Sequence, residues 1–407
     1  MDLMLIIFTV SILVLSLGAV YRKMQEIFLT EPLLAMIAGL LMGPYYLDLI
    51  KLNGFENLKV LEMTCEFTIA MALMATALRI PKNFFLKNIQ TQSIVVVMGM
   101  LLMWLSSSGI LYLIFSDFSI AECLLLGGII TPTDPVLAST IVSGNKAEKN
   151  LPGRLRKTIS FESGVNDGLA FPIVFFSLFL LTNSSFPVNK WLTQTLLYET
   201  VLCAILAFVA GLIAGKIMHK ANNKGIMTTK AVLPFSLGLA FALLSGFNLL
   251  GMNGILAVFI GGLGFNRSIS GNEDIEEERV QEIMERITLI PAFFIFGLII
   301  PLNEWISLGW SGILMVILIL LFRRIPGIFL LKPFLPQFQG KRADVLMLGW
   351  FGPIGVAALY YATLSSEKAS FHEAWVIPGL MVFVSTLLHG CTSLPLGKLY
   401  YKYTSKE

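Results

Sequence analysis

The amino-acid sequence predicts an all-α polytopic membrane protein with about 13 transmembrane helices. Of its 407 residues, 56% are hydrophobic and only 14% are charged, and the mean hydropathy is +0.79. This composition excludes a soluble globular enzyme. A bilayer is crossed by about 20 apolar residues of helix, so crossings and short connections fill a chain of this length. The net charge of +3 gives no reason to expect a nucleic acid as a partner.

Apolar segments of a length that suits a membrane helix follow one another along the whole chain. The first has no basic stretch before it, so we expect a retained span and not a cleaved signal peptide. Between the eighth and the ninth, Asn248 and the run from Gly251 to Gly254 provide a turn. In order, the predicted spans cover residues 3–20, 33–50, 60–78, 92–115, 120–142, 158–182, 195–215, 231–246, 249–265, 287–302, 308–331, 343–364 and 374–396.

Positively charged residues fall on alternate connections between these spans. Lys and Arg resist translocation, so most of them are expected on the cytoplasmic side. With the amino terminus outside, the inner connections hold 23 of the 29 Lys and Arg residues. This split predicts an odd number of spans and a cytoplasmic carboxyl terminus, in an inner or plasma membrane whose lipid surrounds the chain. The remaining basic residues are Lys51, Lys59, Lys190 and Lys368 outside, and Arg323 and Arg324 within the eleventh span.

The fifth span is interrupted in its middle by the run from Thr131 to Pro135. Two prolines remove backbone donors there, so the helix must break inside the membrane. The broken ends expose carbonyl groups and helix termini that can hold a desolvated cation. Asp134 costs about 2.5–3.5 kcal/mol at the bilayer centre, so it needs a partner or a function. The alternative is a proline kink in which Asp134 caps a helix near the membrane surface.

The sixth span begins with two carboxylates, a hydroxyl and an amide within two helical turns. Glu162 and Asn166 share one helix face, and Ser163 and Asp167 share the adjacent face. The two carboxylates point about 140° apart, so we expect them to have different roles. One could meet a cation in the broken fifth span while the other neutralises a fixed positive charge. The alternative is an amphipathic helix end that faces the cytoplasm.

A candidate for that fixed charge lies in the eleventh span, where Arg323 and Arg324 interrupt an apolar stretch. On a helix the two side chains point about 100° apart. We therefore expect one arginine to face an interior carboxylate and the other to extend to the cytoplasm. The alternative places both arginines at the cytoplasmic boundary of the membrane.

The twelfth span has a second interruption, the Gly- and Pro-containing run from Gly349 to Gly355. It lies seven spans after the first interruption. This spacing is expected if spans one to six and eight to thirteen form two inverted six-helix repeats. The predicted repeats cover about residues 1–182 and 231–396, and a linker helix at 195–215 joins them. Paired discontinuous helices, here spans 5 and 12, indicate a transport site near the bilayer midplane.

Two motifs together, Thr133-Asp134-Pro135 and the run from Glu162 to Asp167, resemble the signature of the sodium/proton exchanger family. Within that family the Asn-Asp pair is similar to the bacterial monovalent cation/proton antiporters of the electroneutral type. The resemblance covers nearly the whole chain. It implies thirteen helices in inverted repeats, a homodimer, and a core domain with crossed discontinuous helices that moves against a dimerisation domain.

The resemblance also implies roles for individual residues. It makes Asp167 the carboxylate that binds the ion or the proton, with Asp134 as a second ligand of Na+. Members of the bacterial group often have an arginine where Ile354 stands, so a second buried charge pair is not expected here. The implied ion- and proton-binding residues are Asp167, Asp134, Ser163 and Thr133, and the implied supporting residues are Asn166, Glu162 and Arg324.

We expect a single transmembrane antiporter domain over residues 1–407, without a cytoplasmic regulatory domain. The expected activity is secondary active exchange of Na+ or Li+ for H+ in an electroneutral 1:1 ratio, serving pH homeostasis, with no enzymatic reaction and no cofactor. A buried carboxylate can hold either a proton or a cation, so the two would compete for Asp167. K+/H+ exchange and, from another class, a gated cation channel remain alternatives.

Overall fold

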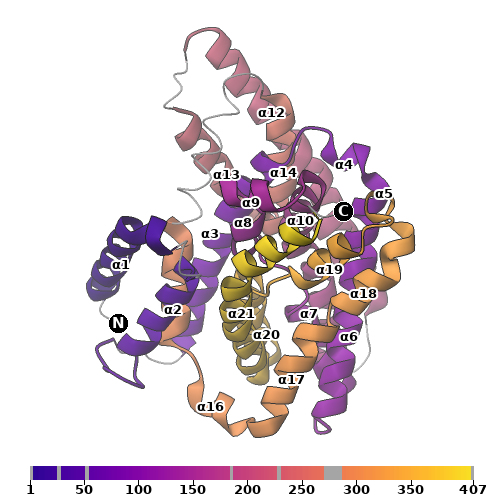
Figure 1. The fold of residues 1–407 in the computed structure, drawn as a ribbon. Helices are drawn as coiled ribbons and strands as arrows, with labels where there is room; N and C mark the ends of the chain where they lie inside the picture. Colours follow the sequence, from indigo (N-terminus) through magenta and orange to yellow (C-terminus); the bar gives the residue numbers. More distant parts are fainter. Residues whose placement is uncertain are drawn as a thin grey trace.

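The computed structural model describes residues 3–24, 29–50, 55–183, 187–226, 231–269 and 287–404. These residues form a bundle of long helices that lie side by side, with shorter helices between them (Figure 1). Several basic residues used to predict the orientation lie outside the described residues, namely Lys51, Lys230, Arg279, Arg286 and Lys406. The orientation in the membrane therefore stays a prediction.

Most of the long helices have the composition of a membrane span. Within the described residues, six helices are long and apolar enough to cross a membrane, and five shorter helices are also apolar. The six cover Asn57–Arg79, Ile89–Ile114, Gly153–Thr182, Val188–Asn223, Gly309–Phe334 and Glu373–Thr404. The shorter ones cover Met4–Val20, Glu31–Met42, Ile120–Ile129, Pro234–Leu249 and Ile287–Leu298. The all-α membrane fold is confirmed, and the number of 13 crossings stays a prediction.

The first helices follow the predicted spans, with one that is shorter than expected. α1 covers Leu3–Met24, α2 covers Glu31–Met42 and α3 covers Phe55–Arg79. The predicted span 33–50 is too long, because Gly43 adopts an extended backbone after Met42 and Pro44 follows it. After the short helices α4 (Phe84–Lys87) and α5 (Ile89–Ser93), a π-helical turn (Ile94–Met98) leads into α6 (Gly99–Ile114).

The fifth predicted span is divided into two helices, α7 (Ile120–Ile129) and α8 (Pro135–Val142). A capping box fixes the start of α7, since Ser119 and Glu122 each accept the other's backbone N–H. The short helix α9 (Gly144–Asn150) then leads to α10 (Gly153–Thr182), which has 30 residues. α10 lies in the middle of the bundle and contacts α3, α7 and α8 (Figure 1).

The predicted linker at 195–215 is part of a longer continuous helix. α11 (Val188–Lys190), the π-helix η2 (Trp191–Leu202) and α12 (Cys203–Asn223) follow one another without a break. α13 (Val232–Leu249) and α14 (Gly254–Ser268) are two helices as predicted, and the turn between them includes Gly251 at a φ of 68°. Glycine favours this left-handed conformation because it has no Cβ. The next helix covers Ile287–Leu298 and is shorter than the predicted span 287–302.

The last part of the chain contains the second discontinuous helix. α19 (Arg342–Trp350) and α20 (Val356–Ala369) are separated by a non-helical segment, so the predicted interruptions of spans 5 and 12 are both confirmed. The preceding span is also broken, because α17 ends at Phe322 and α18 begins at Ile325. The remaining elements are α16 (Leu302–Ser307), α17 (Gly309–Phe322), α18 (Ile325–Leu331), η4 (Lys332–Phe334), η5 (Pro336–Phe338) and α21 (Glu373–Thr404).

The backbones of α12 and α14 are in close contact along a glycine seam, formed by Gly211, Gly215, Gly261 and Gly264. Gly211 lies against the carbonyl group of Gly261, and Gly264 lies against that of Phe208. A Cβ added to Gly215 of α12 would be 2.6 Å from the Cβ of Ser268 in α14. Small residues let two membrane helices approach this closely. The seam joins the linker helix to α14, which itself packs against α10.

Candidate ion-binding site

The first interruption ends in a carboxylate that caps the helix after it. Asp134 has an extended backbone and is the N-cap of α8. Its Oδ1 atom accepts the N–H groups of Val136 at 2.7 Å and Leu137 at 2.9 Å. These are donors that the first turn of a helix leaves unpaired, and an N-cap carboxylate satisfies them. Asp134 is only 2% exposed, so it is a cap inside the protein and not one near its surface.

The same carboxylate also caps the second half of the other discontinuous helix. The Oδ2 atom of Asp134 accepts the N–H of Val356, the first residue of α20, at 2.7 Å. The backbone N–H of Asp134 donates to the carbonyl oxygen of Pro353 at 2.8 Å. Gly355 makes this approach possible, since a Cβ at that position would overlap the Asp134 carboxylate. The two interruptions therefore cross at Asp134.

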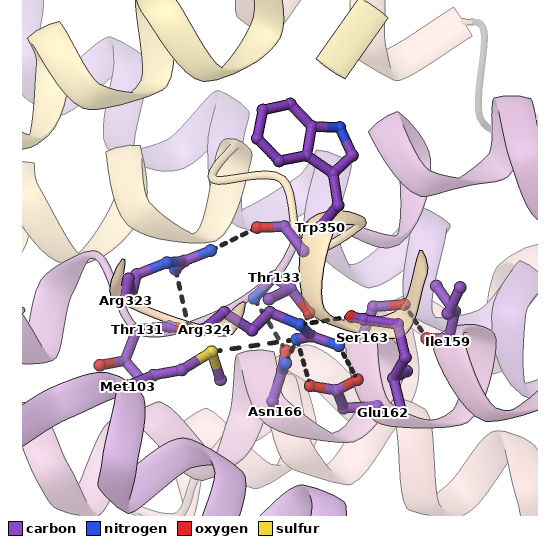
Figure 2. Close-up of polar contacts among 12 residues, drawn as sticks. Met103, Thr131, Thr133, Ile159, Glu162, Ser163, Asn166, Arg323, Arg324 and Trp350 are labelled. Carbon is purple, nitrogen blue, oxygen red and sulfur yellow. Dashed lines mark hydrogen bonds and ion pairs between the residues drawn. The ribbon is translucent and has the colours of Figure 1, made fainter. Parts of the chain in front are cut away.

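Arg323 lies at the opposite helix ends of the same crossing. Its guanidinium donates to the carbonyl oxygens of Ile130 and Gly352, and at 3.3 Å to that of Thr131 (Figure 2). The side chain is 3% exposed. The expectation that one of the two arginines extends to the cytoplasm is wrong, because α17 ends at Phe322 and Arg323 turns inward to carbonyls that have lost their helical donors.

Arg324 forms a buried ion pair with Glu162. Arg324 Nη2 is 2.5 Å from Glu162 Oε2, and Nη1 contacts the other carboxylate oxygen (Figure 2). Arg324 Nε donates to the carbonyl oxygen of Leu348 at 2.8 Å. The side chains are 2% and 1% exposed. Glu162 is thus held in a bidentate pair, which is the favourable geometry for a carboxylate and a guanidinium.

Asn166 and Thr133 join α10 to the first interruption. Asn166 Oδ1 accepts the backbone N–H of Thr133 at 3.1 Å, and Asn166 Nδ2 donates to the Thr133 hydroxyl at 2.7 Å (Figure 2). Ser163 lies on the next face of α10, and its hydroxyl donates to the carbonyl oxygen of Ile159 at 2.8 Å. The Asn166 amide therefore supports the crossing, and the lone pairs of Ser163 Oγ accept no hydrogen bond from the described part of the chain.

Asp167 differs from the other ionisable groups of the crossing. It is 1% exposed, and its Oδ1 atom has no hydrogen-bond partner among the described residues. It directly follows Asn166, whose amide bonds to Thr133, the residue before Asp134. A buried carboxylate without a partner is costly in its charged form. This site therefore favours a carboxylate that carries a proton or a bound cation.

Several supporting contacts are not evident from the sequence. The backbone N–H of Ile354 donates to Ser385 Oγ at 2.8 Å, and the Ile354 side chain is fully buried. His389, one turn further along α21, contacts both Ser385 Oγ at 3.1 Å and the carbonyl oxygen of Trp350 at 3.1 Å. Two polar residues four positions apart in an apolar span were the available signal. Ser385 and His389 thus satisfy backbone groups of the second interruption.

Curated yeast proteins resemble the chain over most of its length. A probable Na+/H+ antiporter of Schizosaccharomyces pombe is 29% identical over 357 residues, which cover 86% of this chain and 47% of that protein. A Na+/H+ antiporter of Saccharomyces cerevisiae is 30% identical over 367 residues, which cover 86% and 36%. The chain thus spans less than half the length of these two relatives. Another S. pombe Na+/H+ antiporter is 29% identical over 421 residues, covering 95% and 89%.

A solved structure shares the fold. The sodium proton antiporter MjNhaP1 from Methanocaldococcus jannaschii, determined at pH 8, aligns with a TM-score of 0.74 and 20% identity over 98% of this chain and 99% of that one. The family model described as "Sodium/hydrogen exchanger, transmembrane" matches residues 10–398, which include both interruptions and the run from Glu162 to Asp167. Because this match covers nearly the whole sequence, the chain belongs to the sodium/hydrogen exchanger family.

Proposed function

We propose that this protein is a secondary active antiporter that exchanges Na+ or Li+ for H+, with both competing for Asp167. The observation that carries the proposal is the buried Asp167 carboxylate, whose Oδ1 atom has no partner among the described residues. Neighbouring ionisable groups are already engaged: Glu162 with Arg324, and Asp134 with three backbone N–H groups. The yeast relatives, which are named as Na+/H+ antiporters, support Na+ and H+ as the exchanged ions.

Further ligands for the cation are proposed from the same crossing. Each carboxylate oxygen has more than one lone pair, so Asp134 can keep its capping bonds and still contact Na+. Ser163 Oγ donates its proton to a helix carbonyl and can accept or coordinate with its remaining lone pairs. The Thr133 carbonyl belongs to the broken segment. These oxygens are ligands of the kind that hard cations prefer.

Exchange follows from the cost of moving an uncompensated charge. An empty, ionised Asp167 is unfavourable in the membrane interior. Only the protein that carries Na+ or a proton at this site can therefore switch the site from one side of the membrane to the other. Coupling then needs no ATP. We also propose a homodimer in an inner or plasma membrane, with the amino terminus outside. The proposed exterior amino terminus follows from the 23 basic residues assigned to the inner connections.

The first test measures ion exchange in proteoliposomes. An imposed gradient of Na+, Li+ or K+ is combined with a pH-sensitive dye inside the vesicles. We expect Asp167→Asn to abolish Na+-driven proton movement while the protein still folds, because an amide can neither titrate nor neutralise a cation. Glu199→Gln is the matched control, since this buried carboxylate accepts from Gln194 at 3.0 Å and should be dispensable for exchange.

Residual Na+-driven proton movement in Asp167→Asn, above that of empty liposomes, would contradict this assignment. A preference for K+ over Na+ in the wild type would favour the K+/H+ alternative. Uncoupled cation flux that does not saturate would favour a gated channel.

We propose a stoichiometry of one Na+ for one H+. Glu162 is held by Arg324, and Asn166 cannot titrate and uses its amide on Thr133. Asp167 is then the main group that changes state, although Asp134 beside it could carry a second proton. With the membrane potential clamped by K+ and valinomycin, the rate of Na+-driven pH change should be the same at all voltages. A reversal point that moves with voltage would refute the 1:1 ratio.

A further inference from the structure

α10 has a weak point immediately after Asp167. Pro172 lies inside this helix and has no N–H group, so the carbonyl oxygen of Gly168, four residues earlier, lacks its helical donor. Gly168 itself has no side chain to restrict its backbone. The turn that carries the proposed ion-binding carboxylate is therefore not fixed by α10 alone.

Asn253 of α14 supplies the missing donor. Its Nδ2 group donates to the Gly168 carbonyl oxygen at 2.8 Å. Its Oδ1 atom accepts the N–H of Leu256 at 3.0 Å as the N-cap of α14, and its backbone carbonyl accepts from the Cys203 thiol at 3.2 Å. The residue is 3% exposed. Asn253 is thus anchored by its own helix and by α12 before it reaches α10.

The neighbouring carbonyl is held from the other side. Tyr361 of α20 is fully buried, and its hydroxyl donates to the backbone carbonyl oxygen of Asp167 at 2.7 Å. The carbonyls of Asp167 and Gly168 are therefore both bound by side chains from other helices. One of these helices, α20, begins at the crossing that Asp134 caps.

Close packing fixes the position of α14 relative to this turn. A Cβ added to Gly168 would be 2.7 Å from the Cα of Leu256, and one added to Gly164 would overlap the ring of Phe259. Gly164 and Gly168 thus bracket Asp167 with two contacts to α14. At this separation there is no room for an intervening side chain, and the short Asn253 side chain reaches the free carbonyl directly.

We propose that Asn253 and Tyr361 are positioning residues for Asp167. By binding the two carbonyls, they hold the weakened turn of α10 so that the carboxylate stays oriented toward the cation. A binding group is effective when its supporting residues fix its geometry in advance. This inference rests on the proposed role of Asp167 in Na+ binding, and it assigns that site's orientation to α14 and α20.

The test combines Asn253→Ser with Pro172→Ala. Serine is a good N-cap, so it keeps the start of α14 but is too short to reach Gly168. We expect Asn253→Ser to raise the KM for Na+ about tenfold, as loss of an outer-shell contact does at metal sites, with a smaller change in maximal rate. Adding Pro172→Ala restores an N–H four residues after Gly168 and should return the KM toward the wild-type value. Tyr361→Phe should also raise the KM.

A purely structural role for Asn253 predicts a lower maximal rate with an unchanged KM, and no rescue by Pro172→Ala. That result would overturn the inference. If the wild type itself shows no Na+-driven exchange, the proposed function fails, and the contact is then judged by melting temperature in detergent. Additive effects of Asn253→Ser and Pro172→Ala on melting would overturn the inference in that case, because the two changes would not share the Gly168 carbonyl.

Discussion

The two helix interruptions have similar shapes but different support. The interruption between α7 and α8 carries its own capping carboxylate, Asp134, and is joined to α10 through Thr133 and Asn166. The interruption between α19 and α20 has no acidic residue of its own. Asp134 also caps its second half at Val356, and a neutral hydroxyl, Ser385, accepts a backbone N–H within it. One interruption thus supplies the charge for both.

This sharing leaves the crossing electrically balanced. Each helix end carries about half an elementary charge, positive at the N-terminus and negative at the C-terminus. The Asp134 carboxylate faces two N-termini, and the Arg323 guanidinium faces carbonyls at two C-terminal ends. Fixed charges at the crossing therefore compensate one another, and Asp167 Oδ1 is left without a partner among the described residues.

The largest expected effect is a loss of stability, and it should differ between the two adjacent arginines. Arg324→Ala leaves the Glu162 carboxylate buried and unpaired, at a cost of about 3–5 kcal/mol. Arg323→Ala leaves neutral carbonyls at both interruptions without a donor, at about 1–3 kcal/mol. Melting temperatures in detergent should therefore fall further for Arg324→Ala.

The partner residue gives an internal check of this ranking. Glu162→Ala should lower the melting temperature more than Asp167→Asn, because Glu162 is paired in the folded protein and Asp167 Oδ1 is not. Equal melting of these two variants, or a larger loss for Arg323→Ala than for Arg324→Ala, would contradict the division of roles.

An intermediate effect is expected when the shared cap is removed from one interruption only. In Asp134→Asn the remaining carbonyl oxygen can still cap α8, since Asn is a good N-cap. The new amide group cannot accept the N–H of Val356, so the start of α20 is left unpaired at a cost of about 1–3 kcal/mol. Hydrogen exchange at Val356 should accelerate more than at Val136, and transport should weaken or stop. Equal acceleration at both amides would show that the cap is not divided in this way.

The smallest effect is expected at the second interruption. Ser385→Ala removes the acceptor for the Ile354 N–H and should cost about 1 kcal/mol. Ser393→Ala on the same helix is the matched control, because among the described residues its hydroxyl donates within α21, to the carbonyl oxygen of Gly390 at 3.1 Å. The difference between the two variants in melting temperature measures the contact. A loss for Ser393→Ala as large as that for Ser385→Ala would assign the effect to α21 itself.

Both interruptions could be predicted from the sequence because their cause is local. The runs from Thr131 to Pro135 and from Gly349 to Gly355 contain prolines, which lack a backbone N–H, and the second also contains glycines, which do not restrict the backbone. These effects do not depend on the rest of the fold. The helix ends after Met42 and Phe322 were missed, although Pro44 follows the first one closely. An apolar segment indicates a span but does not show where its helix stops.

The contacts across the site could not be predicted in the same way, because their partners are distant in sequence. Asp134 and Val356 are 222 positions apart, and Arg323 and Ile130 are 193 apart. The 100° spacing between adjacent residues applies only within a helix, and α17 ends at Phe322, before both arginines. The predicted direction of the Arg323 side chain was wrong for this reason. Asn253 was expected only within a turn, since its partner becomes available through Pro172 in another helix.

The glycine seam between α12 and α14 has a mechanical consequence. Side chains between two helices act as a compliant layer, because they can change rotamer when the helices shift. At Gly211 and Gly261 the two backbones are in direct contact, without side chains between them. We therefore expect α12 and α14 to move together as one rigid unit. α14 also presents Asn253 to α10. Any displacement of α10 against α14 is therefore resisted by the stiffness of the α12–α14 pair, and not by that of α14 alone.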